Sequence, residues 1–201
     1  MSRHEPTFRP HLSRSRVALA ALIIATLALT GSAFAMAEGP ARLSLSPSSA
    51  TVREGQTVDI AIRLDNAFNV AGAEMAIRFN PAVLEVEDAD PSLDGIQIAA
   101  PGPFWGGRQT FQAQNSVDNA AGLIHYSVTI VKSSSEPGVD GPGTLATIRF
   151  HAKGNGLSAL TFEPGSVKLS DSNVNRIAVE ASGGRIIVGY QLFLPLGMRL
   201  H

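Results

Sequence analysis

The stretch TVDIAIRLDNAFNVAGAEMAIRF, residues 57–79, decides the fold, because apolar side chains alternate with polar or small ones along most of it. Its first part, residues 57–64, places four apolar side chains on one side: Val58, Ile60, Ile62 and Leu64. Its last part, residues 70–79, does the same with Ala71, Ala73, Met75, Ile77 and Phe79. A period of two puts every second side chain on one face of a β-strand. The stretch therefore predicts two strands, each with one face in a hydrophobic core.

The same alternation recurs in the rest of the chain, most clearly in residues 124–130, 146–152 and 185–188. Turn-forming pairs and triplets separate these segments, at residues 54–55, 80–81, 94–95, 141–143 and 163–165. Beyond the N-terminal segment, no stretch shows the apolar stripe of a helix. A single sheet would leave its apolar face in water, so we expect an all-β domain of two packed antiparallel sheets with about nine short strands.

Composition excludes several classes of protein. The 201 residues carry a net charge of −1, and the lysines are Lys132, Lys153 and Lys168. Binding to a phosphate backbone requires a basic surface, so we expect no nucleic-acid partner. Cysteine is absent. The chain therefore has no disulfides, no thiolate metal site and no cysteine nucleophile.

The first residues have the pattern of a secretory signal peptide. Arginines at positions 3, 9, 14 and 16 precede an apolar run from 17 to 29, and residues 33–35 fit an A-x-A cleavage site. As a helix the run would span roughly 20 Å, short of the ~30 Å hydrocarbon core, which argues against the alternative of an uncleaved membrane anchor. We expect a signal peptide at 1–37, a β-domain at 38–189, an apolar tail at 190–201, and a secreted protein with no membrane span after cleavage.

Candidate catalytic groups are few. Beyond the signal segment and before the last residue, the histidines are His125 and His151, both at outward strand positions. H-E-x-x-H, G-x-S-x-G and phosphate-binding glycine motifs are absent from the sequence. We therefore expect a protein that is not an enzyme and binds no cofactor, with a hydrolase as the least favoured hypothesis.

Carboxylates gather in LEVEDADPSLDG, residues 84–95, as Glu85, Glu87, Asp88, Asp90 and Asp94. They could be solvated loop acids, calcium ligands or part of a glycosidase pair, and the first interpretation is favoured. A second segment, residues 171–175, begins like a calcium loop, but Arg176 replaces the required glycine and Ser182 stands where a glutamate belongs. We expect no metal site.

The loop at 99–108, APGPFWGGR with its flanking alanine, contains the single tryptophan. Phe104 and Trp105 are open to two interpretations. They could form an exposed platform on which a sugar ring stacks, or they could cap one end of the core, as large aromatic residues often do. The first interpretation gives the alternative function, a β-sandwich that binds carbohydrate directly.

Four segments follow one another in a particular order: residues 54–91, 121–135, 141–156 and 160–188. The first contains a G-x-x-V strand, the motif F-N-P-A-V-L and an acidic D-x-x-P continuation. The third fits the pattern G-x-[LVF]-A-x-I-x-F-x-[AV]-K. Together these motifs resemble the cohesin domain, the receptor module of bacterial cellulosome scaffolds, over about residues 42–188.

The resemblance implies a nine-stranded jelly-roll sandwich that binds a dockerin, a small calcium-loop module attached to secreted glycoside hydrolases, through one flat sheet face. Family members have an Asn and an Asp on the strand before F-[ND]-P. Here the Asp position falls on Glu74, which keeps the carboxylate, and the Asn position falls on Gly72, which has no side chain.

Two further segments resemble variants of this family. The chain has one cohesin-like domain, without the repeated domains of a cellulosome scaffold. Its loops at 91–107 and 114–122 look like those of solitary secreted cohesin-like proteins of environmental bacteria. The ending YQLFLPLGMRLH, residues 190–201, resembles the tail of secreted proteins of Chloroflexus-type bacteria. We expect this tail to be either an added edge strand or a signal for sorting or attachment to the cell surface.

Outward strand positions supply the expected binding face, a mixture of both charges and small polar groups that suits a protein partner. Its residues are Glu74, Arg78, His125, Ser127, Thr129, Thr147 and Arg149. The sequence thus predicts a secreted, non-catalytic module that captures a dockerin-like partner and is associated with the binding or breakdown of extracellular polysaccharide.

Overall fold

The computed structural model describes residues 39–133 and 135–189. The signal peptide predicted at 1–37 and the tail predicted at 190–201 lie outside the described residues and stay predictions. Strands fill most of the described chain, in this order: β1 (Ala41–Ser46), β2 (Ser49–Val52), β3 (Thr57–Arg78), β4 (Leu84–Val86), β5 (Thr110–Asp118), β6 (Leu123–Ile130), β7 (Val139–Ala152), β8 (Gly156–Phe162), β9 (Lys168–Asp171), β10 (Arg176–Ile177), β11 (Val179–Ser182) and β12 (Gly184–Val188). A short 3-10 helix, η1 (Pro103–Trp105), precedes β5. Within the described ranges, no helix is long and apolar enough to cross a membrane.

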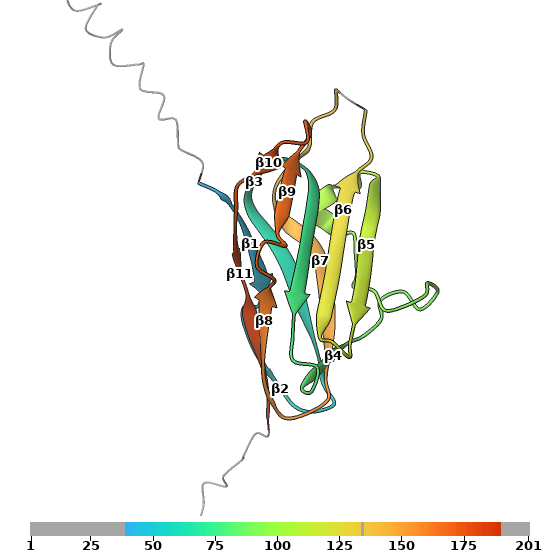
Figure 1. The fold of residues 1–201 in the computed structure, drawn as a ribbon, viewed down its shortest axis with the longest axis vertical. Coiled ribbons are helices and arrows are strands. Elements are labelled where there is room, and N and C mark those ends of the chain that lie inside the picture. The colour runs from blue at the N-terminus through green and yellow to red at the C-terminus, as the bar shows by residue number, and fades with distance from the viewer. Residues whose placement is uncertain (1–38, 134, 190–201) are drawn as a thin grey trace, which may run out of the picture. The chain divides into compact units, whose positions relative to one another are not determined.

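The strands form two layers (Figure 1). One layer has the order β11–β1–β3–β7–β4 and uses the first half of β3. In the other layer, β6 and then β5 lie on one side of the second half of β3. Its other side pairs with β9 and, further along, with β8, and β12 and then β2 follow β8. The chain passes repeatedly from one layer to the other, as in a jelly roll. The predicted all-β sandwich is confirmed.

Strand number and pairing differ from the prediction in detail. The described residues contain twelve strands rather than about nine. The additional strands are short, such as β10 and β11, and so small a segment shows no readable alternation. Two pairings, β1 with β11 and β12 with β2, are parallel, and each of them joins one of the first strands of the domain to one of the last.

Strand β3 joins the two layers, although its sequence reads as two strands. Between its halves the register with β7 shifts, and Asn66 and Asn69 have φ angles of 51° and 54°. Asparagine tolerates this left-handed region better than most residues. The bend is held from outside the strand, because the Asn69 backbone N–H donates to Asp140 Oδ1 at 2.7 Å and Asn69 Oδ1 accepts from the Gly138 N–H at 2.6 Å.

The core lies between the layers and consists of the side chains that the alternation placed inside. From β3 these include Ile60, Ile62, Leu64, Met75 and Ile77, each at most 2% exposed. The facing strands β6 and β7 add Ile124, Tyr126, Val128, Ala146, Ile148 and Phe150. Burying this apolar surface supplies the main driving force for folding. The predicted inner faces of these strands are therefore confirmed.

Candidate partner-binding face

The layer that holds β6 and β5 has a broad outer surface, which we name the β3–β6 face. It consists of the outward side chains of β5, β6, β9 and the second half of β3. Directly opposite residues of neighbouring strands share a face, so the register gives its rows. One row runs Phe111, Thr129, Gly72, Ser170. The next runs Gln114, Ser127, Glu74, Lys168.

Most of the predicted site residues lie on this face: Glu74, Arg78, His125, Ser127 and Thr129. Thr147 and Arg149 do not, and the prediction of a single face is wrong for them. They belong to β7, where Thr147 lies opposite Ala61 and Arg149 opposite Asp59 in the other layer. Alternation shows that a side chain points outward, but it does not show which sheet its strand joins. For this reason the sequence predicts one common face for Thr147, Arg149 and the residues of β3 and β6.

Two ion pairs lie on the β3–β6 face, one near its centre and one where β3 ends. Glu74 Oε1 accepts a hydrogen bond from Lys168 Nζ at 2.9 Å, and Arg78 pairs with Glu163. The side chains of Glu74 and Lys168 are 50% and 55% exposed. Such exposed pairs contribute little to stability, so both charges remain available to a partner. The sequence did not identify Lys168 or Glu163, because their positions depend on pairing between distant segments.

A shallow hollow of about 340 Å³ lies at one end of this face. Its lining comes from β3, β6, β9 and the β9–β10 turn: Gly72, Ala73, Glu74, Ser127, Val128, Thr129, Lys168, Leu169, Ser170, Val174 and Arg176. Gly72 lies between Thr129 and Ser170 and leaves space above the strand. The sequence shows that position 72 has no side chain, but it does not predict the hollow. The hollow also needs β9 and the β9–β10 turn, which pairing between distant segments brings to this face.

The β9–β10 turn beside the hollow is closed on itself. Asp171 Oδ1 accepts the backbone N–H groups of Asn173 and Asn175, both at 2.8 Å, and Asp171 Oδ2 accepts Asn175 Nδ2 at 3.0 Å. The Asn175 side chain, followed by these backbone donors, lowers the pKa of Asp171. The residues that resemble the start of a calcium loop therefore stabilise a turn. Among the residues that the structure describes, no group of three or more His, Asp and Glu could hold a metal ion.

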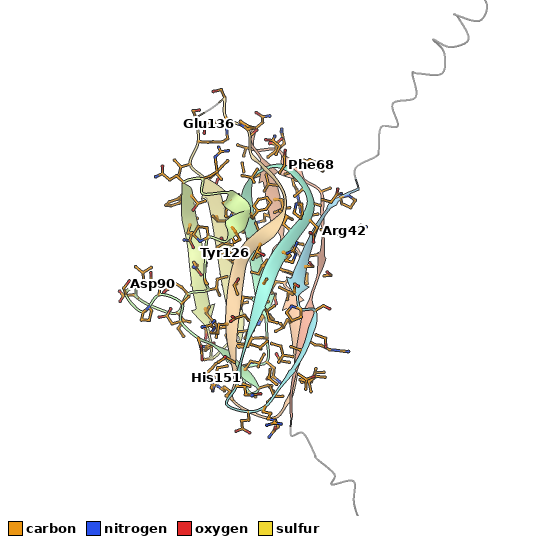
Figure 2. The ribbon with its side chains drawn as sticks, turned by 180° about the vertical axis from the view of Figure 1, so that it is seen from behind. Arg42, Phe68, Asp90, Tyr126, Glu136 and His151 are labelled. Carbon is orange, nitrogen blue, oxygen red and sulfur yellow. The ribbon has the colours of Figure 1, made fainter. Side chains whose placement is uncertain are left out.

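The acidic segment at 84–95 runs from β4 into a projecting loop, where Figure 2 labels Asp90. Asp88 Oδ1 accepts the backbone N–H groups of Gln97 at 3.0 Å and Asp90 at 3.2 Å, and Asp90 in turn accepts from Ser92. Glu87 lies 3.7 Å from His151 Nδ1 on the outer surface of the other layer. Asp88 and Asp90 therefore shape the loop, and Glu87 and Asp88 also line a hollow of about 280 Å³ together with Asp59 and Arg149.

The outer surface of the other layer carries Thr147 and Arg149. Arg149 Nε and a terminal guanidinium nitrogen donate to the two carboxylate oxygens of Asp59, at 2.8 and 2.9 Å. This hydrogen-bonded pair holds the pKa of Asp59 below its usual value. The pair is about half exposed, like the pair of Glu74 and Lys168, but it lies on the other layer.

Phe104 and Trp105 are core residues, and the sugar-stacking interpretation is wrong for them. Phe104 is 5% exposed and Trp105 is 1% exposed, so neither presents a ring face to solvent. The two rings pack edge to face with centroids 5.0 Å apart. Phe104 lies directly on the backbone of β7, where a Cβ atom at Gly143 would come within 2.9 Å of its ring. Apolar burial and the close approach at glycine explain why the aromatic pair turns inward.

Comparison with known proteins gives one family. The family model of the cohesin domain matches residues 43–188. No match is found among curated proteins. Solved structures with the same fold include a type II cohesin domain from the cellulosome of Acetivibrio cellulolyticus, with TM-score 0.60 and 19% identity over 74% of this chain and 95% of that one.

Two other solved structures are similar to this chain. A non-cellulosomal cohesin from the archaeon Archaeoglobus fulgidus has TM-score 0.55 and 18% identity over 76% of this chain and 93% of that one. The sixth cohesin of scaffoldin B from Acetivibrio cellulolyticus, solved in complex with a mutant Cel5 dockerin, has TM-score 0.55 and 15% identity over 75% of this chain and 100% of that one. At these identities the likeness shows the fold.

Proposed function

Because this chain belongs to the cohesin domain family, we propose that it is a non-catalytic receptor module that binds a dockerin through its β3–β6 face. The observation that carries the proposal is the position of Glu74, a half-exposed carboxylate at the centre of that face. The resemblance of the sequence to the family places Glu74 where family members have an aspartate. The cohesin of scaffoldin B, whose fold this chain shares, was solved with a dockerin bound.

The face suits a folded protein better than a small molecule. It is broad, and its hollow is shallow rather than an enclosed cavity. It mixes an acidic group, basic groups and small polar side chains, a composition typical of interfaces between separately folded partners. The carbohydrate alternative loses its aromatic platform, because Trp105 is buried. Dockerin binding is therefore the function that the geometry supports best.

The proposed setting is extracellular. Residues 1–37 have the pattern of a secretory signal, and the binding domain follows at 38–189. The tail at 190–201 is either an added edge strand or a signal for sorting or attachment to the cell surface. A dockerin partner would connect this domain to a secreted glycoside hydrolase and so to the breakdown of polysaccharide. The absence of cysteine is compatible with this setting, since the fold needs no disulfide.

A pull-down from the culture medium of the source organism tests this function. The full chain, immobilised, is exposed to the medium with and without a calcium chelator. We expect it to retain a protein with a D-x-N-x-D-G calcium loop, and to release it when calcium is removed, because the loops of a dockerin fold around calcium. If nothing with such a loop is recovered, the proposed function is wrong.

Replacing Glu74 by alanine should weaken binding and leave the fold intact. The carboxylate is half exposed, so we expect the free energy of unfolding to change by less than about 0.5 kcal/mol. Losing a charged hydrogen bond at the centre of an interface should weaken dockerin binding by about 1–3 kcal/mol. Calorimetric titration with the recovered dockerin, beside a thermal melt, measures both.

Asp59 provides the matched control for Glu74. Its side chain is also 50% exposed and also paired with a basic residue, but it lies on the other layer. Asp59→Ala should leave dockerin affinity unchanged. Equal affinities for the Glu74→Ala variant, the Asp59→Ala variant and the wild type would show that Glu74 is only a solvated strand residue.

A further inference from the structure

We propose that a hollow between the projecting loop and the edge strand β5, which we name the loop hollow, binds a segment of a neutral polysaccharide. It measures about 820 Å³, within the size range of sites that bind small molecules. One wall is the loop that carries Asp90 and projects beside β5 (Figure 2), and the other is residues 112–115 of β5. The loop hollow shares no lining residue with the hollow at Gly72, so the inference goes beyond dockerin binding and does not depend on it.

The β5 wall carries amide groups where a core strand would carry apolar ones. Gln112 lies opposite Val128 and Asn115 lies opposite Tyr126, and both of these partners are buried in the core. Directly opposite residues share a face, so the two amides lie on the inward side of the edge strand. This edge of the sandwich is therefore polar, which suits a ligand that forms hydrogen bonds.

Hydrogen bonds hold both walls of the loop hollow in place. Asn115 Oδ1 accepts the Ile98 backbone N–H, and Asn115 Nδ2 donates to the Ile98 carbonyl oxygen, both at 3.0 Å. Gln112 Oε1 accepts a further hydrogen bond from Asn115 Nδ2 at 3.1 Å. Ala99 exchanges two backbone hydrogen bonds with Thr147 of β7, at 3.0 and 2.9 Å. Because the walls are already ordered, a ligand loses little binding free energy to ordering them.

Two acceptors in the loop hollow lack a donor. Gln97 is 7% exposed, and its Nε2 donates to the Asp94 carbonyl oxygen at 2.8 Å. Its Oε1 is buried and accepts no hydrogen bond from any residue that the structure describes. Within the same part of the chain, the Asp94 carboxylate has no hydrogen-bond or ion-pair partner. An unsatisfied buried acceptor costs free energy, so a ligand that brings donors to these groups is bound favourably.

The lining favours a neutral ligand rich in hydroxyl groups. Among the described residues, no lysine or arginine lines the loop hollow, so an anionic ligand would meet no opposite charge. Asp90 already accepts two hydrogen bonds from Ser92, so its charge is less available to a cation than that of Asp94. Leu93 is 59% exposed and Pro101 is also exposed, and both can pack against C–H groups. A sugar combines hydroxyl donors with apolar C–H faces and matches both kinds of group.

The loop hollow continues into a neighbouring one, which favours a chain over a single sugar. Ala89, Ala99 and Thr147 line both the loop hollow and the hollow of about 280 Å³ at Asp59 and Arg149. A ligand with several linked units can therefore extend from one hollow into the other. More units bury more surface and form more hydrogen bonds, so affinity should rise with the length of the oligosaccharide.

A glycan array probed with the full chain tests the inference. It carries neutral hexasaccharides of glucose, xylose and mannose, anionic hexagalacturonate, the cationic hexamer of glucosamine, and the corresponding monosaccharides. We expect the chain to bind at least one neutral hexasaccharide, and to bind it more tightly than its monosaccharide. Binding to the charged hexamers alone would overturn the inference, and so would binding to none of the glycans.

Variants show whether the binding takes place in the loop hollow. Gln97→Met keeps the length of the side chain and removes its acceptor, and Asp94→Asn removes the unpartnered carboxylate. Each should weaken binding of the retained hexasaccharide about tenfold in a calorimetric titration. Ala99→Leu narrows the hollow from an exposed position and should also weaken binding, which keeps the test decisive if Gln97→Met misfolds.

Glu180→Gln is the matched control, because Glu180 is also an exposed carboxylate but lies on β11, away from the loop hollow. It should bind the hexasaccharide as the wild type does. Affinity unchanged in Gln97→Met, Asp94→Asn and Ala99→Leu would overturn the inference. Dockerin binding by these variants should equal that of the wild type, so that failure of the loop hollow leaves the receptor function standing.

Discussion

Replacing Trp105 by alanine is expected to lower the free energy of unfolding by about 3–5 kcal/mol, the usual cost of removing a buried tryptophan. Trp105 is 1% exposed and packs edge to face on Phe104, so the variant leaves a cavity between the η1 loop and the core. The surrounding strands are joined by hydrogen bonds and can collapse into this cavity only in part. Urea unfolding followed by circular dichroism measures the loss.

Phe111→Ala is the matched control for Trp105→Ala. Phe111 is also an aromatic residue, but it is 60% exposed on the edge strand β5, and its replacement should change the free energy of unfolding by no more than about 0.5 kcal/mol. A Trp105→Ala variant as stable as wild type would contradict the buried position of the ring. Retarded migration of the wild type in polysaccharide gels, lost in that stable variant, would restore the sugar-stacking interpretation.

Much of the fold could be predicted from the sequence, because a period of two decides which face of a strand is buried. Ile60, Ile62 and Leu64 were assigned to the core on that ground, and they are completely buried. The continuity of β3 could not be predicted. It depends on left-handed conformations at Asn66 and Asn69, which hydrogen bonds to residues far along the chain stabilise.

The candidate site could be predicted only in part. The outward direction of Glu74 and Ser127 follows from alternation, and their direct opposition follows from the register of β3 with β6. Lys168 and Arg176 could not be placed on the same face, because β9 joins β3 through a pairing between segments more than 90 residues apart. The alternation of apolar and polar residues does not show which distant strands pair. For the same reason it does not show that Arg149 lies opposite Asp59, in the layer that does not contain β6.

Replacing Ser127 by tryptophan should weaken dockerin binding by at least about 100-fold. Ser127 lies directly opposite Glu74 at the centre of the β3–β6 face, and its side chain is small and points outward. A large ring there would stand above a flat surface and hold a partner away from Glu74 and from the hollow at Gly72. The fold should tolerate the change, because the ring projects into solvent and leaves the core unaltered.

The most direct test of the receptor function is therefore a calorimetric titration of three chains with the dockerin recovered from the culture medium. The chains are the wild type, Ser127→Trp and Thr147→Trp, whose altered residues are both half-buried and outward but lie on opposite layers. We expect Ser127→Trp to lose binding while Thr147→Trp binds as the wild type does. Binding retained by Ser127→Trp and lost by Thr147→Trp would contradict the proposed receptor face.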